Sequence, residues 1–383
     1  MTDQKIKKTF HIITPVGFEN LAKNELLHLW PCAPITKLEK GALCIASEEM
    51  EFFRHIPYLK IPTKILMEID QFICRDIVKF YNKLTKVKWN QFLFGQIPEF
   101  AISAKNSRLF DSRKIEDSAK KAISNYYKAQ PPQKKYADIL ESLPPSTIHV
   151  RILDDNCTLS VDLSGERLDK RGLKLFTSEA PVRENLASAC LQFSFEQIKN
   201  QGDEIESIID PMCGSGTFLF EALMKDLPQK REFYYKYLSS YKLEKKHVYN
   251  YQGRITKFIG NEISENTFKG LEKNIKVYQS LFTQTLPIQV IHGDATHFVS
   301  TDSTSSLLIT NPPYGKRVKV EGSTKDYFDE LMDIYDKNCA PNYMAFLIPK
   351  IIPNPKNKNY RFLDALNFSN GGIDVKLLLW KRK

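Results

Sequence analysis

The stretch Asp210-Pro-Met-Cys-Gly-Ser-Gly-Thr217 decides the fold, because it joins an expected strand to an expected helix through a glycine turn. Residues 205–209 contain the isoleucines of a short buried strand, and residues 218–224 follow a helical pattern. Gly214 and Gly216 have no side chain, so the backbone can pass close to a ligand at this turn. In open α/β sheets, ligands bind in the crevice at the carboxyl ends of the strands. The stretch therefore predicts an α/β domain with a ligand crevice next to residue 210.

The ligand expected at this turn is not a dinucleotide. A dinucleotide site favours G-x-G-x-x-G, whereas this turn reads G-S-G-T and closely follows Asp210. A carboxylate at a strand end suits a ligand with positive charge and hydroxyl groups, such as S-adenosylmethionine. The alternative is a glycine turn that only connects strand to helix. The candidate cofactor contacts in this turn are Asp210, Met212, Cys213, Gly214, Ser215, Gly216 and Thr217.

Two further carboxylates are expected at strand ends of the same sheet. An expected strand over residues 255–259 leads to Glu262, and another over residues 287–291 leads to Asp294. Glu262 can accept hydrogen bonds from both ribose hydroxyls, although it could simply begin a helix favourably. Asp294 can accept a hydrogen bond from the adenine amino group. We therefore expect Glu262 and Asp294, with the adjacent Ile263 and Ala295, to bind the cofactor.

A second motif, Asn311-Pro312-Pro313-Tyr314, follows an expected strand over residues 306–310. The exocyclic amine of a nucleobase is a poor nucleophile because its lone pair is delocalised into the ring, so an enzyme must orient both N–H groups. The Asn311 side-chain oxygen and the Pro312 carbonyl can accept these bonds, and Tyr314 offers a flat face for a flipped base. The motif therefore predicts catalysis by alignment, with Asn311 also near the cofactor and no metal ion. The alternative is a rigid two-proline turn.

The two motifs resemble those of class I S-adenosylmethionine-dependent RNA methyltransferases that modify the N2 amine of guanosine. Residues 14–27, 163–172 and 180–186 resemble in particular the bacterial THUMP-domain 23S ribosomal RNA guanine-N2-methyltransferases of the RlmL type. Residues 370–377 look like the last strand of that family. The resemblance spans nearly the whole chain.

This resemblance implies an α+β part followed by an α/β part. A ferredoxin-like segment would occupy residues 1–55, a THUMP RNA-binding domain residues 56–165, and a Rossmann-like class I methyltransferase domain residues 166–383, with a connection over residues 164–182. Glu262 stands where many relatives have Asp, which keeps a carboxylate, and Asp169 stands where His is usual. Some relatives have a second methyltransferase domain, which is not expected here.

The net charge of +10 over 383 residues suits a polyanionic partner. The basic stretch 105–114 precedes a helix expected over residues 115–127 and is a candidate for contacts with RNA phosphates. A solvated charged helix face explains the stretch equally well, and only the family resemblance favours RNA. The candidate RNA contacts are Lys105, Arg108, Arg113 and Lys114 in this stretch, Arg167, Lys170 and Arg171 in the connection, and Lys316 and Arg317 after the second motif.

The seven cysteines are scattered, without a C-x-x-C pair or a histidine spacing that would hold zinc. We therefore expect reduced thiols, no metal and a cytoplasmic location. No stretch has the length and hydropathy of a signal peptide or a membrane span. Residues 228–251 are rich in Tyr and Lys and interrupt the alternation of strands and helices, so we interpret them as an insertion. Its Tyr234, Tyr235 and Tyr237 either pack locally, which we favour, or are available for base stacking.

The sequence thus predicts a methyltransferase that acts on the N2 amine of a guanosine, in 23S ribosomal RNA or a large-subunit precursor. Transfer RNA is an alternative substrate, because no residue pattern reads the target sequence. An alternative of another class is a non-catalytic RNA-binding assembly factor, which the joint presence of Asp210, Glu262, Asp294 and Asn311 disfavours. Adenine-specific DNA and protein glutamine methyltransferases also contain N-P-P-Y, but they do not account for the first 165 residues.

Overall fold

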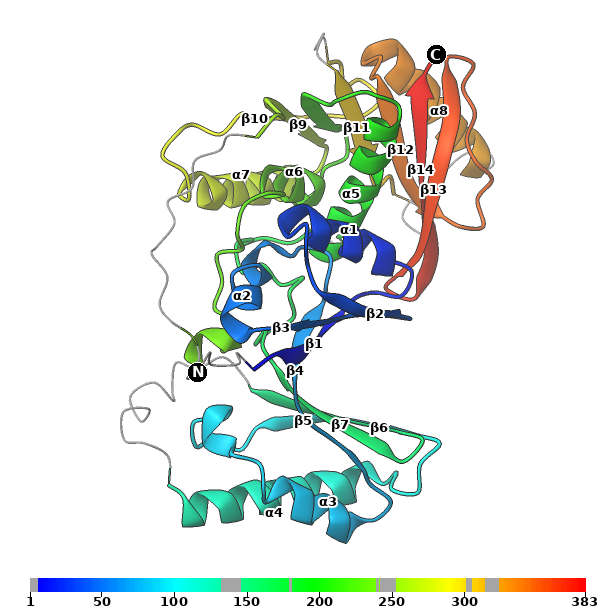
Figure 1. The fold of residues 1–383 in the computed structure, drawn as a ribbon. Helices are drawn as coiled ribbons and strands as arrows, with labels where there is room; N and C mark the ends of the chain where they lie inside the picture. Colours follow the sequence, from blue (N-terminus) through cyan, green and yellow to red (C-terminus); the bar gives the residue numbers. More distant parts are fainter. Residues whose placement is uncertain are drawn as a thin grey trace. The chain divides into compact units, whose positions relative to one another are not determined.

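The computed structural model describes residues 6–131, 146–178, 181–238, 241, 253–300, 305–313 and 324–383. The chain forms two compact units, each built on one sheet of seven strands (Figure 1). Unit 1 comprises residues 1–15, 26–170 and 231–245. Unit 2 comprises residues 16–25, 171–230 and 246–383.

The sheet of unit 1 has the strand order β2-β3-β1-β4-β7-β6-β5. Neighbouring strands are antiparallel except β5 and β6, which run parallel. The sheet continues across the boundary predicted at residue 55, because β1 pairs with both β3 and β4. The strands are β1 (Lys8–Ile13), β2 (Ile35–Glu39), β3 (Ala42–Ser47), β4 (Lys64–Ile73), β5 (Glu99–Lys105), β6 (Thr147–Leu153) and β7 (Asn156–Asp162).

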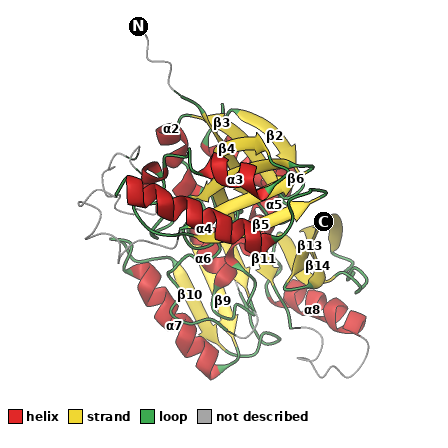
Figure 2. Ribbon diagram, turned by 90° about the horizontal axis from the view of Figure 1, so that it is seen from below, coloured by secondary structure: helices red, strands yellow, loops and turns green. Residues whose placement is uncertain are grey.

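Helices α3 and α4 of unit 1 lie side by side (Figure 2). Each begins with an aspartate whose side chain accepts a hydrogen bond from a free backbone N–H group. Asp76 accepts from Lys79 N at 2.7 Å, and Asp111 accepts from the amides of Arg113 and Lys114. The helices of this unit are α2 (Glu49–Phe53), α3 (Ile77–Leu84) and α4 (Ser112–Ala129), with short 3-10 turns at Ile56–Tyr58, Trp89–Gln91 and Tyr234–Tyr237.

Residues 233–238 return to unit 1 and contribute to its core. Tyr234 and Tyr235 are buried, and the Tyr234 hydroxyl donates to the Phe92 carbonyl at 2.6 Å. The predicted packing of tyrosines in this stretch is therefore confirmed for these two residues, which pack into the core of unit 1 and not within the stretch itself. Arg231 supports the return by donating hydrogen bonds to the backbone carbonyls of Ser164, Glu166, Arg167 and Lys170.

The sheet of unit 2 has the strand order β10-β9-β8-β11-β12-β14-β13, and the strands from β10 to β12 in this order run parallel. The antiparallel pair β13 and β14, red in Figure 1, forms one edge. The strands are β8 (Ser207–Asp210), β9 (Lys257–Glu262), β10 (Ile288–His292), β11 (Ser306–Thr310), β12 (Tyr343–Pro349), β13 (Tyr360–Asn370) and β14 (Ile373–Arg382). The helices are α5 (Glu184–Asn200), α6 (Thr217–Leu223), α7 (Glu265–Gln279) and α8 (Thr324–Asn338). Helix α1 (Glu19–Leu29) belongs to this unit up to residue 25.

The strand order of unit 2 reverses between β8 and β11. From β8 the chain continues to β9 and β10 on one side, whereas β11 pairs on the other side of β8 and is followed by β12. Such a reversal leaves a crevice at the carboxyl ends of the two strands where connections diverge. Asp210 ends β8 and Asn311 follows β11. Both predicted motifs therefore lie at the point where an α/β sheet binds its ligands.

Candidate cofactor and acceptor cleft

A cleft of about 790 Å³ opens at the carboxyl ends of the central strands of unit 2. Its volume is within the range of small-molecule sites. The polar residues predicted at four strand ends, Asp210, Glu262, Asp294 and Asn311, all line it. So do Met212, Cys213, Gly214, Ser215, Thr217, Ile263, Ala295, Pro312 and Pro313. The structure therefore brings the two predicted motifs together around one cavity.

The glycine turn has left-handed backbone at Gly214 (φ +54°) and Gly216 (φ +87°), which glycine adopts without strain. Gly216 does not line the cleft. A Cβ atom at Gly216 would lie 2.6 Å from Phe220 and 2.8 Å from Leu271. This glycine therefore allows α6 to pack closely against α7.

Asp210 is the most deeply buried carboxyl group of the cleft, with 2% of its surface exposed. Its Oδ1 accepts a hydrogen bond from Met212 N at 3.2 Å. Burial raises the pKa of Asp210 to about 7, and the nearby charge of Glu262 adds to the increase. A cation in the cleft would favour the ionised form of Asp210.

Glu262 links the glycine turn to the loop after β9. Its Oε2 accepts from Gly214 N at 3.1 Å, and its Oε1 accepts from Ser264 N at 2.8 Å. Each carboxylate oxygen has a further lone pair, so the group can still accept hydrogen bonds from a ligand. These two bonds fix the orientation of the carboxylate predicted to contact ribose.

Asn261 is a buried cleft residue that the sequence analysis did not identify. Its Nδ2 donates to the Pro211 carbonyl at 3.1 Å and to the Gly293 carbonyl at 2.9 Å. These bonds join the end of β9 to the loops that follow β8 and β10. Since the partners lie 50 and 32 residues away in sequence, no local pattern predicts them.

Asp294 lies exposed after β10. Its Oδ1 accepts from the backbone N of Thr296 at 2.8 Å and from the Thr296 hydroxyl at 2.9 Å. These bonds lower the pKa of Asp294. Both use the same oxygen, so the ionised carboxylate is held in place with its other oxygen outside these contacts.

One wall of the cleft is formed by Phe176, Thr177 and Ser178 of the connection. Asn274 of α7, fully buried, attaches this wall to the glycine turn. Its Oδ1 accepts from Leu175 N at 2.9 Å and Phe176 N at 3.0 Å. Its Nδ2 donates to the carbonyls of Phe176 at 2.9 Å and Ser215 at 3.2 Å. All four hydrogen-bonding capacities of this amide are therefore used to hold the wall.

Arg171, a predicted RNA contact, lies inside unit 2 and not on its surface. Arg171 is 5% exposed and makes a bidentate ion pair with Glu221 of α6, at 3.1 Å from Nε and 2.9 Å from Nη2. The Ser188 hydroxyl also donates to Glu221. Arg171 therefore stabilises the packing of the connection against α5 and α6, because its charge is neutralised inside the unit.

Lys174 is a second buried cation of the connection. Its Nζ donates to the Thr217 hydroxyl at 2.7 Å and lies 3.1 Å from Glu184 Oε1. Thr217 is the first residue of α6 and the last of the glycine-turn motif. Lys174 thus fixes the start of α6 relative to α5.

Asn311 presents a buried acceptor to the cleft. Its Oδ1 has no hydrogen-bond partner among the residues that the structure describes. Buried acceptors are nearly always paired, so this oxygen lacks a partner that a ligand could supply. Tyr314, Lys316 and Arg317 lie outside the described residues.

Tyr327 of α8 also lines the cleft and was not identified from sequence. Burial raises the pKa of its hydroxyl to about 12, so the phenol stays neutral. It provides an aromatic side chain in the described part of the cleft. Cys213 lines the cleft too, and burial raises the pKa of its thiol. A neutral thiol is a weak nucleophile, so we interpret Cys213 as a small residue that fits the turn.

The remaining predicted RNA contacts lie in unit 1. Lys105, Arg108, Arg113 and Lys114 are all exposed. Arg167 pairs with Asp169 through two bonds of 2.9 and 3.1 Å, and Lys170 lies 3.2 Å from Glu166. The basic stretch 105–114 therefore offers accessible cations, of which Lys114 lies 3.8 Å from Asp111, whereas Arg167 and Lys170 have closer acidic partners.

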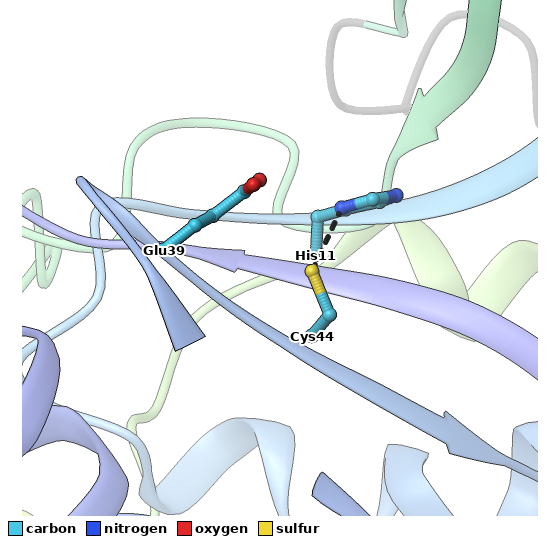
Figure 3. A group of neighbouring side chains, drawn as sticks. All are labelled: His11, Glu39 and Cys44. Atoms are coloured by element: carbon cyan, nitrogen blue, oxygen red, sulfur yellow. Dashed lines mark hydrogen bonds between the residues drawn. The ribbon is translucent and has the colours of Figure 1, made fainter. Parts of the chain in front are cut away.

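A cluster on unit 1 joins three types of side chain that bind metals elsewhere: His11, Glu39 and Cys44 (Figure 3). Hydrogen bonds to Cys44 and Glu68, both 3.3 Å, raise the pKa of His11 to about 9. A protonated imidazole donates from both nitrogens and has no lone pair for a metal. The Glu39 carboxylate lies 2.7 Å from Lys37 and 3.5 Å from Arg151. We interpret the cluster as a hydrogen-bonded and ion-paired network of the sheet.

The described residues contain no helix that is both long and apolar enough to cross a membrane. The fold and the cleft together define a class: unit 2 is a Rossmann-like α/β domain with a ligand cleft at the switch point of its sheet. A solved methyltransferase complexed with SAH superposes with a TM-score of 0.74, at 18% identity, and covers 99% of each chain.

Comparison with families gives the particular assignment. Residues 171–353 match the RMKL-like methyltransferase domain, and residues 74–162 match the THUMP domain. The chain thus combines a match to the RMKL-like methyltransferase domain with a match to the THUMP domain.

Two curated relatives illustrate the range of this family. The ribosomal RNA large subunit methyltransferase K/L of Buchnera aphidicola is 26% identical over 83% of this chain and 46% of its own length. The tRNA (guanine(6)-N2)-methyltransferase of Methanocaldococcus jannaschii is 26% identical over 84% of this chain and 85% of its own length. The chain thus spans about half the length of the K/L relatives that it matches.

Proposed function

We propose that this chain transfers a methyl group from S-adenosylmethionine to the exocyclic N2 amine of a guanosine in RNA. The observation that supports this most is the unpaired Oδ1 of Asn311, in the cleft at the switch point of the sheet. An unpaired buried acceptor costs about 1–3 kcal/mol. An amine N–H group of a bound base would remove that cost.

The cleft fits S-adenosylmethionine by the chemistry of its side chains. Asp210 would balance the positive charge of the methionine part, Glu262 would accept from the ribose hydroxyls, and Asp294 would accept from the adenine amine. The cofactor supplies a methyl group bonded to a cationic sulfur. The SAH bound to the similar solved methyltransferase agrees with this assignment.

The acceptor residues would act by orientation. Asn311 Oδ1 accepts one N–H group of the base amine, and the Pro312 carbonyl accepts the other. The consecutive rings of Pro312 and Pro313 restrict the backbone, so the two acceptors keep a fixed separation. With both N–H directions set, the amine lone pair points along one line, which lowers the entropic part of the barrier.

RNA as the substrate is supported by the THUMP domain and by the names of the relatives. We propose 23S ribosomal RNA or its large-subunit precursor, which agrees with the K/L relatives. Transfer RNA is the second candidate. It is supported by the tRNA (guanine(6)-N2)-methyltransferase relative, which is 26% identical to this chain.

Label transfer tests the proposal. The protein is incubated with methyl-labelled S-adenosylmethionine and unmodified 23S RNA, a large-subunit precursor particle or transfer RNA, and the products are digested to nucleosides. N2-methylguanosine from 23S RNA or the particle is the expected result. N2-methylguanosine from transfer RNA alone would show that transfer RNA, and not 23S RNA, is the substrate. Label in adenosine, or no label in any of the three RNA substrates, would contradict the proposed reaction.

A further inference from the structure

Phe110 is a large apolar side chain with 73% of its surface exposed. It lies in the loop between β5 and α4 of unit 1, one residue before the aspartate that caps α4. Its neighbour Leu109 is buried at 8% exposure and packs into the core. The loop is therefore anchored by Leu109 while the adjacent aromatic ring is left in solvent.

The loop that presents Phe110 is held by hydrogen bonds on both sides. Asp155, in the turn between β6 and β7, accepts from Arg108 N at 2.8 Å and from Arg75 Nε at 3.1 Å. The Ser107 hydroxyl donates to the Lys105 carbonyl at 2.8 Å and accepts from Asp155 N at 3.1 Å. The loop backbone next to Phe110 is thus held in place before any partner binds, which lowers the entropic cost of binding.

The exposed ring is surrounded in sequence by exposed cations. Lys105, Arg108, Arg113 and Lys114 lie within five residues of Phe110 on either side. The first amides of α4 are already used by Asp111, so the basic side chains, and not the helix end, would bind an anion. An aromatic face beside several cations is complementary to a nucleotide, which offers a flat base and a phosphate. A protein partner would favour a broader apolar surface.

We propose that Phe110 stacks on an unpaired base of the RNA substrate while Arg108 and Arg113 bind the adjacent phosphates. The proposal rests on the proposed function only in taking RNA as the partner. Because every base has a flat face, such stacking tolerates many sequences. The loop would therefore bind a single-stranded segment of the RNA, and this contact would not select the guanosine that is modified.

Fluorescence anisotropy of the full chain tests this with two labelled probes, an unmodified transfer RNA transcript and a single-stranded RNA oligonucleotide. Phe110→Ala should weaken binding of a probe about 5- to 100-fold and leave its salt dependence unchanged. Phe110→Tyr should bind as the wild type does. Arg108→Ala should weaken binding and also reduce the salt slope. Val78→Ala, which removes an exposed apolar side chain from α3 (65% exposed), is the matched control.

Equal affinity of Phe110→Ala and wild type for both probes would overturn the proposal, as would a wild type that binds neither. An equal loss in Val78→Ala would also overturn it. Methyl transfer is measured separately at saturating RNA. RNA binding that depends on Phe110 in a protein without transferase activity would support this surface and contradict the proposed function.

Discussion

Asn274→Asp tests whether the wall of the cleft depends on one buried amide. The substitution preserves shape and leaves Oδ1 to accept from Leu175 and Phe176. It removes the two donor bonds to the carbonyls of Phe176 and Ser215, at 2.9 and 3.2 Å, and turns an oxygen toward them. Each lost bond is worth about 1 kcal/mol net, and each unpaired buried carbonyl adds up to about as much again. We therefore expect a loss of about 2–4 kcal/mol in unfolding free energy.

Two measurements detect the effect of Asn274→Asp. Urea unfolding gives the stability, and hydrogen exchange of a peptide that contains Leu175 and Phe176 reports opening of the wall itself. We expect faster exchange and weaker binding of S-adenosylmethionine. Asn82→Asp, at an exposed position of α3, is the control and should change stability by less than about 0.5 kcal/mol. Unchanged exchange together with a stability loss below about 1 kcal/mol would refute the reasoning.

The remaining predictions concern Asp210, Glu221 and Gly270. The pKa of Asp210 in the folded protein is raised to about 7. Its contribution to the free energy of unfolding is therefore fully present below the pKa that it has in the unfolded chain, and is lost as the pH rises through 7. Urea unfolding of Asp210→Asn should lack this decline between pH 4 and 7, and an unchanged pH profile would contradict it. Glu221→Gln removes the carboxylate of the buried ion pair with Arg171 and should cost about 3–5 kcal/mol in urea unfolding. A loss below about 1 kcal/mol in the free energy of unfolding would show that the ion pair of Arg171 and Glu221 does not stabilise the fold. A Cβ at Gly270 would lie 2.2 Å from Phe176, so Gly270→Ala should weaken cofactor affinity in calorimetry, whereas wild-type affinity would show that the ring is free to move.

Local patterns predicted the elements that form the site. The strand expected over residues 306–310 coincides with β11, and the helix expected over residues 115–127 lies within α4. The strand expected over residues 255–259 is shifted to Lys257–Glu262, because pairing with β8 and β10 extends it to the cleft. Carboxylates and glycines at strand ends were predictable because their chemistry is local to each turn.

Long-range contacts account for what the sequence did not reveal. Asn261 and Asn274 are ordinary polar residues in sequence, and their role comes from partners on other elements. Arg171 looked like an accessible cation because Glu221, its partner, lies 50 residues away. The exposure of Phe110 likewise depends on how Leu109 anchors the loop. A single sequence does not specify which polar or apolar side chain is buried.

The most direct test of the central claim separates catalysis from cofactor binding at Asn311. Single-turnover transfer to guanosine N2 is measured for Asn311→Ala with the RNA that the wild-type protein methylates. Calorimetry on the same preparation gives the affinity for S-adenosylmethionine. We expect the transfer rate to fall by at least about 100-fold while cofactor affinity stays within a few-fold of wild type. A transfer rate close to that of the wild type would contradict the role of Asn311 as the acceptor of the substrate amine. Loss of cofactor binding would place this residue in the cofactor site alone.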